Sequence, residues 1–165
     1  MRIRVTADGW LYGGKQRYRC ALGRSGVRID KREGDGATPA GLYPLHQLLY
    51  RADRLVRPDS RLPMAKIQAT DGWCDDPADA AYNRAVTLPH DASTEAMWRA
   101  DGLYDLVVLT GHNDDPVVAG RGSAIFIHVA SPDYGPTEGC VALSRPDLLA
   151  LLPHLAVGSE VQIEP

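Results

Sequence analysis

Cys140 and His128 are the two side chains in this sequence whose types and spacing best suit covalent chemistry. His128 ends the apolar run 123–128, and Cys140 follows twelve positions later, directly after Gly139. The stretch between them holds two prolines and a glycine, so it can fold back and set the start of one strand beside the end of another. That arrangement would bring a thiol next to an imidazole.

The chemistry of a thiol explains why this pair matters. A free thiol with a pKa of ~8.5 is mostly protonated at neutral pH, and only the thiolate attacks well. A neighbouring imidazole removes the proton or pairs with the thiolate. Gly139 admits backbone angles that a β-carbon forbids, and could leave backbone N–H groups pointing at a developing oxyanion. The pattern predicts a nucleophile and its base, although spacing alone leaves open a purely structural cysteine and histidine.

The other two cysteines do not suggest chemistry. Cys20 and Cys74 form no CxxC pair with each other or with Cys140, and an odd, sparse set does not indicate a disulfide framework. Cys20 lies in the alternating run 16–22, where we expect a small buried hydrophobic residue. Cys74 receives no role from its context.

Short apolar or alternating runs dominate the chain and must position the reactive pair. Separated by Gly, Pro and Asp, they predict strands over residues 2–6, 16–22, 103–109, 123–130, 139–143 and 160–163. Strands spaced in this way are typical of a mostly β domain, closed as a sandwich or barrel with a few short helices. The length of 165 residues suits one domain over 1–165, with no repeat or linker to divide it.

Helical signals are fewer. Ser144 to Asp147 has the form of a capping box with a proline in the first turn, and the leucines that follow supply one apolar face. We therefore expect a helix over 145–153. Residues 47–53 and 93–100 are weaker helix candidates.

Two polar stretches are predicted to form loops. Residues 30–41 are rich in Gly and charge, but they lack the Gly-Lys-Ser/Thr ending of a phosphate-binding loop. Residues 70–83 contain Trp73, Tyr82 and Asn83 among several aspartates. Long loops with polar and aromatic side chains often bind ligands, so we expect these three residues to contact substrate.

Charge and hydropathy exclude other classes of protein. The formal net charge is -3 and no dense Lys/Arg cluster exists, so nucleic acid is not an expected partner. No stretch approaches the ~20 apolar residues that span a bilayer, and the first residues lack the apolar run of a secretory signal. We expect no membrane partner and a cytoplasmic location.

Two segments of the sequence resemble the L,D-transpeptidase catalytic domain, the YkuD-like family. His128, a loop and Thr137-Glu-Gly-Cys140 are similar to the family's active-site pattern of a His, a loop and Ser/Thr-x-Gly-Cys. Gly34-Asp-Gly-Ala-Thr-Pro-Ala-Gly-Leu-Tyr43 is similar to its Gly-x-x-x-Thr-Pro-x-Gly-x-Tyr/Phe segment. The two occur in the family's order, and with the flanking strands the resemblance covers about residues 2–163.

The resemblance implies a β sandwich with a Cys/His site that acts on peptidoglycan stem peptides. Cys140 would attack the carbonyl of the third residue, usually meso-diaminopimelate, release D-alanine and form a thioester. His128 would be the general base, oriented by a backbone carbonyl. Gly139 and Cys140 would form the oxyanion hole through their backbone N–H groups. No cofactor is implied.

Two departures from the family pattern affect substrate binding. Glu138 stands where the family frequently has His, and Ala142 stands where many members have Arg. Candidates for the missing cation are Lys31, Arg84 and Arg121. The full set of residues that we expect to bind substrate is Trp73, Tyr82, Asn83, His112, Asn113, Arg121, Thr137 and Glu138.

Two alternatives remain to the cysteine enzyme. A zinc hydrolase could use His112, Asp114, His128 and Cys140, but the sequence lacks the His-Glu-x-x-His pattern, so we expect no metal ligands at the site. A catalytically inactive binder of wall peptides is the other, and a low-pKa thiol at position 140 would count against it.

The resemblance permits either hydrolysis or cross-linking, because water or an amine can resolve the thioester. We expect an L,D-carboxypeptidase that trims imported muropeptides, with an L,D-transpeptidase as the alternative. A chain without an export signal would not reach the wall, and water at ~55 M is the abundant acceptor.

Overall fold

The computed structural model describes all residues, 1–165, as a mostly β fold. It contains fourteen strands, one short α-helix and one 3-10 helix, which confirms the expected fold class. In chain order they are β1 (Arg2–Thr6), β2 (Trp10–Gly13), β3 (Gln16–Ala21), β4 (Val27–Arg28), β5 (Thr38–Pro39), β6 (Gly41–Tyr50), β7 (Met64–Lys66), β8 (Asp71–Cys74), β9 (Ala85–Thr87), β10 (Thr94–Ala96), β11 (Leu106–Thr110), β12 (Phe126–Val129), β13 (Val141–Leu143), α1 (Arg145–Leu151), η1 (Leu152–His154) and β14 (Glu160–Glu164).

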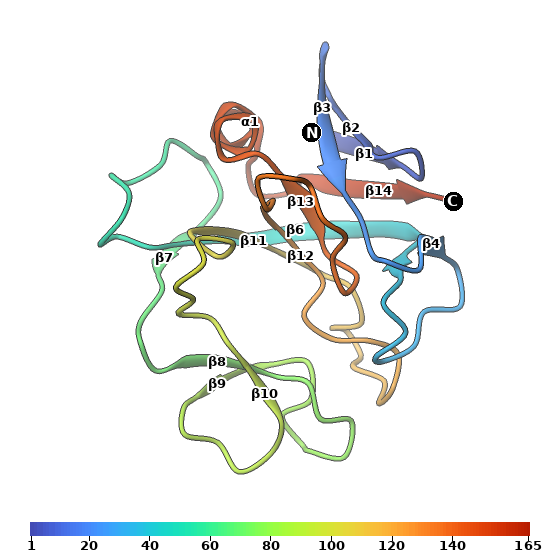
Figure 1. The fold of residues 1–165 in the computed structure, drawn as a ribbon, viewed down its shortest axis with the longest axis vertical. Helices are drawn as coiled ribbons and strands as arrows, with labels where there is room; N and C mark the ends of the chain where they lie inside the picture. The colour runs from blue at the N-terminus through green and yellow to red at the C-terminus, as the bar shows by residue number, and fades with distance from the viewer.

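Nine strands form the main sheet, in the order β11-β12-β13-β3-β2-β1-β14-β6-β7. A further pairing joins β11, at one end of this order, to β6, which is next to the other end, so the sheet closes on itself in a barrel-like form (Figure 1). β6 makes the closure possible because it is long enough to pair with three strands, β14, β7 and β11. Its first part pairs with β14 and its second part, from Leu45 to Tyr50, pairs with β11.

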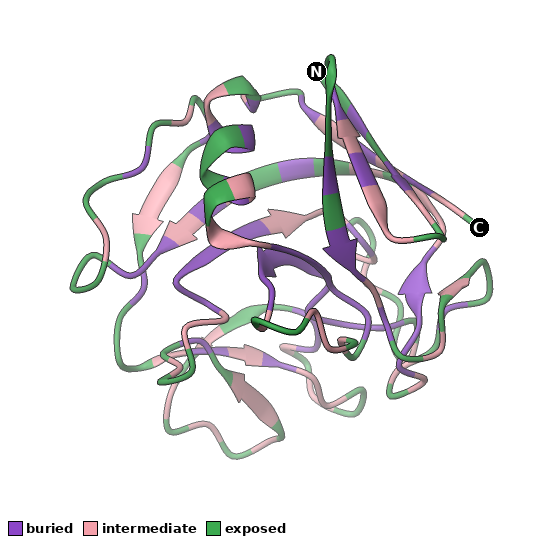
Figure 2. Ribbon diagram, turned by 45° about the horizontal axis from the view of Figure 1, so that its top comes forward, coloured by how far each residue is buried: buried purple, intermediate pink, exposed green.

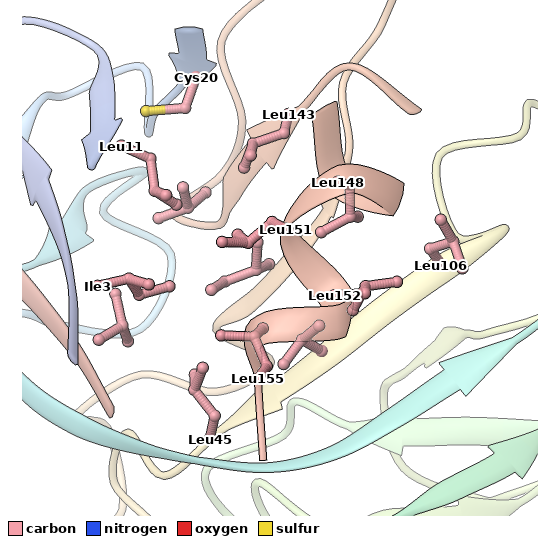
Figure 3. Packing of buried hydrophobic residues seen from close by; sticks show 14 of the residues in the cluster. Ile3, Leu11, Cys20, Leu45, Leu106, Leu143, Leu148, Leu151, Leu152 and Leu155 are labelled. Atoms are coloured by element: carbon pink, nitrogen blue, oxygen red, sulfur yellow. The ribbon is translucent and has the colours of Figure 1, made fainter. Parts of the chain in front are cut away.

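The interior of the main sheet is an aliphatic core that α1 and η1 complete. Four leucines of this helical segment are fully buried and pack with residues from strands on several sides, among them Ile3, Leu11, Leu45, Leu106 and Leu143 (Figure 3). Figure 2 shows α1 with buried residues on one side and exposed residues on the other. The core therefore anchors the strands that flank the helix in sequence, β13 and β14.

The predicted helix begins where the sequence indicated. The Ser144 hydroxyl accepts a hydrogen bond from the Asp147 N–H at 3.2 Å, and Pro146 lies in the first turn. The α-helix ends at Leu151, earlier than the predicted 153, and the tighter η1 takes over before Pro153. Leu148 and Leu151 supply the buried side.

Two other expectations about local structure were wrong, and a third was correct only in part. Residues 47–53 are not a helix, because 47–50 continue β6 and pair with β11. Residues 93–100 contain β10 rather than a helix. The predicted loop 70–83 begins with β8, whose partners β9 and β10 lie on either side of it. In each case long-range pairing overrides a weak local preference.

β8, β9 and β10 make a separate three-stranded sheet, here called the cap sheet, that lies apart from the main sheet in Figure 1. A small apolar cluster joins the two, with Trp73 of β8 packed edge-on against Phe126 of β12 at 5.1 Å between ring centroids. No helix in the protein is long and apolar enough to cross a bilayer.

Candidate active site

β12 and β13 bring Cys140 and His128 onto one face of the main sheet. The two strands are parallel, with Ile127 opposite Val141 and His128 opposite Ala142. Alternation along a strand places Ile127 and Val141 in the aliphatic core, and therefore Phe126, His128, Cys140 and Ala142 on the other face. Cys140 is thus a diagonal neighbour of His128 across the strand pair, within the reach of side chains.

The Cys140 thiol is buried and held by backbone groups. Its Sγ accepts the Phe126 N–H at 3.3 Å and donates to the Ala124 carbonyl at 3.1 Å. Burial raises the pKa of this thiol to about 12, and the negative charge of Glu95 adds to the rise. The Phe126 N–H opposes the rise, as do the charges of Lys31 and Arg99. The resting sulfur is therefore a neutral thiol, not the low-pKa thiolate that would count against an inactive binder.

His128 is oriented by the chain itself. Its Nδ1 lies 2.9 Å from the Val129 carbonyl, to which it donates, so Nε2 is the nitrogen that can accept a proton. Burial lowers the pKa of the ring to about 4, which keeps it neutral at pH 7. Tyr104 packs edge-on against the ring at 5.2 Å between centroids. No hydrogen bond joins the ring to Cys140 in this conformation, because the thiol is turned to Ala124.

The turn 137–140 fixes the backbone around Cys140. The Thr137 hydroxyl donates to the Cys140 carbonyl at 2.7 Å and accepts the Gly139 N–H at 3.1 Å. The Cys140 N–H has no acceptor in the protein. Of the two N–H groups expected at the oxyanion hole, that of Gly139 is thus engaged by Thr137, and that of Cys140 is free.

The Thr-Pro segment of the second motif lies directly behind this turn. A β-carbon on Gly139, whose φ is 141°, would lie 2.7 Å from the Ala37 carbonyl oxygen. The buried Thr38 hydroxyl accepts the Gly23 N–H at 2.8 Å, and Gly23 pairs with Thr137. The two motifs therefore form one support, in which only glycine fits against Ala37.

Cys140 and His128 open on a cleft of about 660 Å³. Thr137 and Glu138, both expected to bind substrate, line it. Glu138 is mostly exposed and pairs with Arg24 at 3.1 Å. Ala142 also lines the cleft but is almost fully buried.

Trp73, Tyr82 and Asn83 lie behind the wall of the cleft rather than in it. Asn83 is buried, and its amide accepts from Trp73 Nε1 and the Ala124 N–H and donates to the His112 and Asn113 carbonyls. Tyr82 donates to Glu33 and accepts the Gly122 N–H. The polar groups of these side chains are thus paired within the protein. Two of the bonds, from the N–H groups of Gly122 and Ala124, hold the 122–124 segment, which carries the acceptor of the Cys140 thiol.

His112, Asn113 and Arg121 line a smaller hollow of about 300 Å³, separate from the cleft but adjoining it at Lys31. The His112 Nε2 lies 3.0 Å from the Arg121 carbonyl. Asp114 pairs with His46 at 2.6 Å instead of approaching His128. The four ligands considered for a catalytic zinc therefore do not gather at one point.

The cations of the cleft differ from those expected. Arg84 donates to backbone carbonyls of Asn83 and Asp114 and does not line the cleft, whereas Lys31 does and is paired with Asp35. Arg99 is the second cation, and sequence reasoning missed it together with Tyr104, Glu95 and Asp75. Asp75 lies in the stretch 70–83 that the sequence marked as a possible ligand-binding loop, but no local pattern marks the other three, which tertiary packing brings to the cleft.

The cleft has a surplus of negative charge. Arg99 is held by Asp101 and faces Glu95 at 3.8 Å. Burial raises the pKa of Glu95, whose carboxylate accepts from the Tyr104 hydroxyl. Asp75 carries a buried carboxylate oxygen with no hydrogen-bond partner. An ammonium group on a ligand would satisfy such an oxygen.

Comparison with known proteins agrees with the resemblance noted in the sequence. L,D-transpeptidase 3 from Mycobacterium tuberculosis, solved in complex with a faropenem-derived adduct, is a structural neighbour with 14% sequence identity and a TM-score of 0.46. The match covers 99% of this chain and 60% of that one, so the chain spans well under the full length of the neighbour. No curated protein matches. The family model of the L,D-transpeptidase catalytic domain, YkuD, matches residues 3–163, and the chain therefore belongs to this family.

Proposed function

We propose that the chain is a cysteine-dependent enzyme that removes the terminal D-alanine from peptidoglycan stem tetrapeptides, an L,D-carboxypeptidase. The observation that carries the proposal is the placement of Cys140 and His128 on one face of the β12–β13 pair, at the floor of one cleft. Family membership supports the substrate class. Residues 1–165 act as one catalytic domain in this proposal.

Acylation begins from a neutral pair. The Cys140 side chain turns from the Ala124 carbonyl toward His128, whose Nε2 takes the thiol proton as Sγ attacks the carbonyl carbon of the third residue. The free Cys140 N–H donates to the oxyanion. The tetrahedral intermediate collapses to a thioester, the C–N bond breaks, and the amine of D-alanine leaves with the proton from His128.

Hydrolysis completes the cycle. His128 takes a proton from a water molecule, the hydroxide adds to the thioester carbonyl, and the C–S bond breaks to release tripeptide and restore the thiol. The engagement of Glu138 by Arg24 supports this outcome over transpeptidation, because that carboxylate is not free to hold an acceptor amine. The three unpaired cysteines suit a reducing compartment, which supports action on peptides recovered into the cytoplasm.

The charge of the cleft favours a third residue with an ammonium group, such as meso-diaminopimelate. Asp75 is the carboxylate with an unused acceptor, since Glu33 accepts from Tyr82 and Ser123, Glu95 accepts from Tyr104, and Glu138 pairs with Arg24. An ammonium beside Asp75 would supply the partner that its buried oxygen lacks.

The test uses tetrapeptide in ¹⁸O-labelled water, with mass spectrometry of the products. Hydrolysis yields tripeptide carrying one ¹⁸O at its new carboxylate, together with free D-alanine. A second reaction adds a D-amino acid or a second stem peptide as acceptor. Predominance of exchanged or cross-linked product would replace the carboxypeptidase with a transpeptidase.

An inactive binder of wall peptides is a second candidate, and one observation favours it: burial raises the pKa of the Cys140 thiol to about 12. A binder would retain tetrapeptide without forming a thioester. Intact-protein mass spectrometry of acid-quenched reactions distinguishes the two, because only the enzyme gains the mass of the acylated tripeptide.

A further inference from the structure

Cys74, Asp79 and His90 form a cluster in the cap sheet that the proposed chemistry does not use. Cys74 is the last residue of β8, Asp79 lies in the turn that follows, and His90 lies in the loop after β9. Each offers one ligand atom, and these atoms all lie within 4.8 Å of one another. The sequence spacing fits no established metal motif, so only the fold reveals the group.

The imidazole of His90 faces the Asp79 carboxylate without a hydrogen bond between them. Its Nε2 is buried and makes no hydrogen bond, although it lies 3.4 Å from Oδ2 of Asp79. Two such atoms bound to one tetrahedral zinc, at bond lengths of about 2.0–2.2 Å, lie about 3.4 Å apart. Their spacing is that of two ligands of one ion.

The Asp79 carboxylate is held in a fixed orientation for this role. One of its oxygens, Oδ1, accepts the Ala81 N–H at 2.7 Å, which leaves Oδ2 facing His90. A hydrogen bond of this kind orients the ligating oxygen of a metal site. Asp75 and Asp76, adjacent to Cys74 in sequence, add negative charge that a divalent cation would offset.

The donor set selects the metal. A thiolate, an imidazole and a carboxylate are the ligands of zinc, whereas calcium and magnesium prefer oxygen alone. The same trio could suggest a second nucleophile, but Cys74 is fully buried and, unlike Cys140, does not line the cleft where a substrate carbonyl would bind. We propose that Cys74, Asp79 and His90 bind a zinc ion, with water as the fourth ligand.

The zinc would stabilise the cap sheet. It would link the turn after β8 to the loop after β9, and the chain between these ligands includes Tyr82 and Asn83. Those two residues hold the 122–124 segment by hydrogen bonds. Zinc binding therefore strengthens the wall of the cleft without touching the reacting groups.

Metal content and affinity test the site directly. Protein stripped with chelator is titrated with zinc, with metal counted by mass spectrometry and Tm followed by calorimetry. We expect one zinc per chain and, at zinc concentrations about 100 times Kd, a Tm rise of roughly 5–10 °C. Cobalt in place of zinc should give a thiolate-to-metal charge-transfer band.

Matched variants locate the ion. Cys74→Ala and His90→Gln should each weaken zinc binding by more than about 100-fold and abolish the Tm rise, since ligands matter more than the groups that orient them. Cys20→Ala, at another buried cysteine, should bind zinc as the wild type does. Cys140→Ala should also keep its zinc, which separates this site from the catalytic pair.

Three results would overturn the proposal: a stoichiometry near zero at saturating zinc, unchanged affinity in both Cys74→Ala and His90→Gln, or loss of the zinc in Cys140→Ala. Because His90 is partly exposed, His90→Gln decides the matter if Cys74→Ala fails to fold. Failure of the peptide assays would leave all of these readouts unaffected.

Discussion

The two faces of the β12–β13 pair carry opposite kinds of residue. On one face Ile127, Val129, Val141 and Leu143 join the aliphatic core that α1 completes. On the other face His128 and Cys140 line the cleft. Because side chains alternate along a strand, one short segment both anchors itself in the core and presents the two candidate catalytic side chains. The packed core on one side therefore positions these side chains on the other.

Burial acts differently on the two faces. In the aliphatic core it stabilises the fold, since most of the residues there have side chains without a polar group. On the cleft face it raises the pKa of the Cys140 thiol to about 12 and lowers the pKa of His128 to about 4. Both shifts favour the neutral forms, and in the proposed mechanism the proton moves from Cys140 to His128 only after substrate binds.

Removal of the proposed nucleophile should abolish turnover without affecting the stability of the fold. We expect Cys140→Ala to lower kcat by at least ~10⁴-fold, since no covalent intermediate can form, with little change in Tm. D-alanine release and calorimetry on the same preparation measure both effects. Cys20→Ala, in the aliphatic core, is the control and should keep its turnover. Substantial activity in Cys140→Ala would exclude the cysteine mechanism.

The pH dependence of Cys140 alkylation should reflect the burial of its thiol. A pKa of about 12 means that the thiolate fraction of Cys140 grows about tenfold per pH unit through the neutral and alkaline range, so alkylation should be about 100-fold faster at pH 9 than at pH 7. Peptide mapping after timed iodoacetamide treatment isolates this cysteine from the others. A small thiol with a pKa of ~8.5 levels off near pH 9 and serves as the reference. If the alkylation rate at Cys140 instead reached its plateau below neutral pH, Cys140 and His128 would form a thiolate–imidazolium pair.

A substitution on the core face should have the converse effect. Leu143→Ala removes a fully buried side chain from the aliphatic core, and we expect a loss of about 2–5 kcal/mol in the free energy of unfolding. The folded fraction should retain most of the wild-type kcat, because Leu143 points away from the cleft. Urea unfolding, with kcat measured well below the midpoint, separates the two. A kcat loss comparable with that of Cys140→Ala would mean that the faces are not independent.

The sequence was most informative where one segment carries the whole signal. Cys140 and His128 lie twelve residues apart, and the helix start at Ser144 follows from local capping chemistry. The mostly β class follows from alternation in strands such as β1 and β14. In each case the residues that form the sequence pattern also form the local structure that it predicts.

The rest of the site depends on contacts between distant segments. Glu95 of β10 reaches the cleft because the cap sheet packs on β12, and Tyr104 reaches it by packing on His128; the closure of β6 on β11 has no local signature. Polarity suggested that Tyr82 and Asn83 bind substrate, but their polar atoms are satisfied by the chain. A sequence shows which side chains can form hydrogen bonds, but it does not show which of them are already hydrogen-bonded within the fold.

The smallest expected effect concerns the turn 137–140, which leads into β13. Thr137→Val removes a hydroxyl that both donates to the Cys140 carbonyl and accepts the Gly139 N–H. Each lost hydrogen bond costs about 1 kcal/mol, and looser placement of the thiol should lower kcat about tenfold with little change in KM. Thr137→Ser keeps the hydroxyl and should restore kcat, which a purely steric role would not predict. If instead KM rose with kcat unchanged, Thr137 would act on substrate binding from its place in the cleft, and the turn would position the nucleophile without its help.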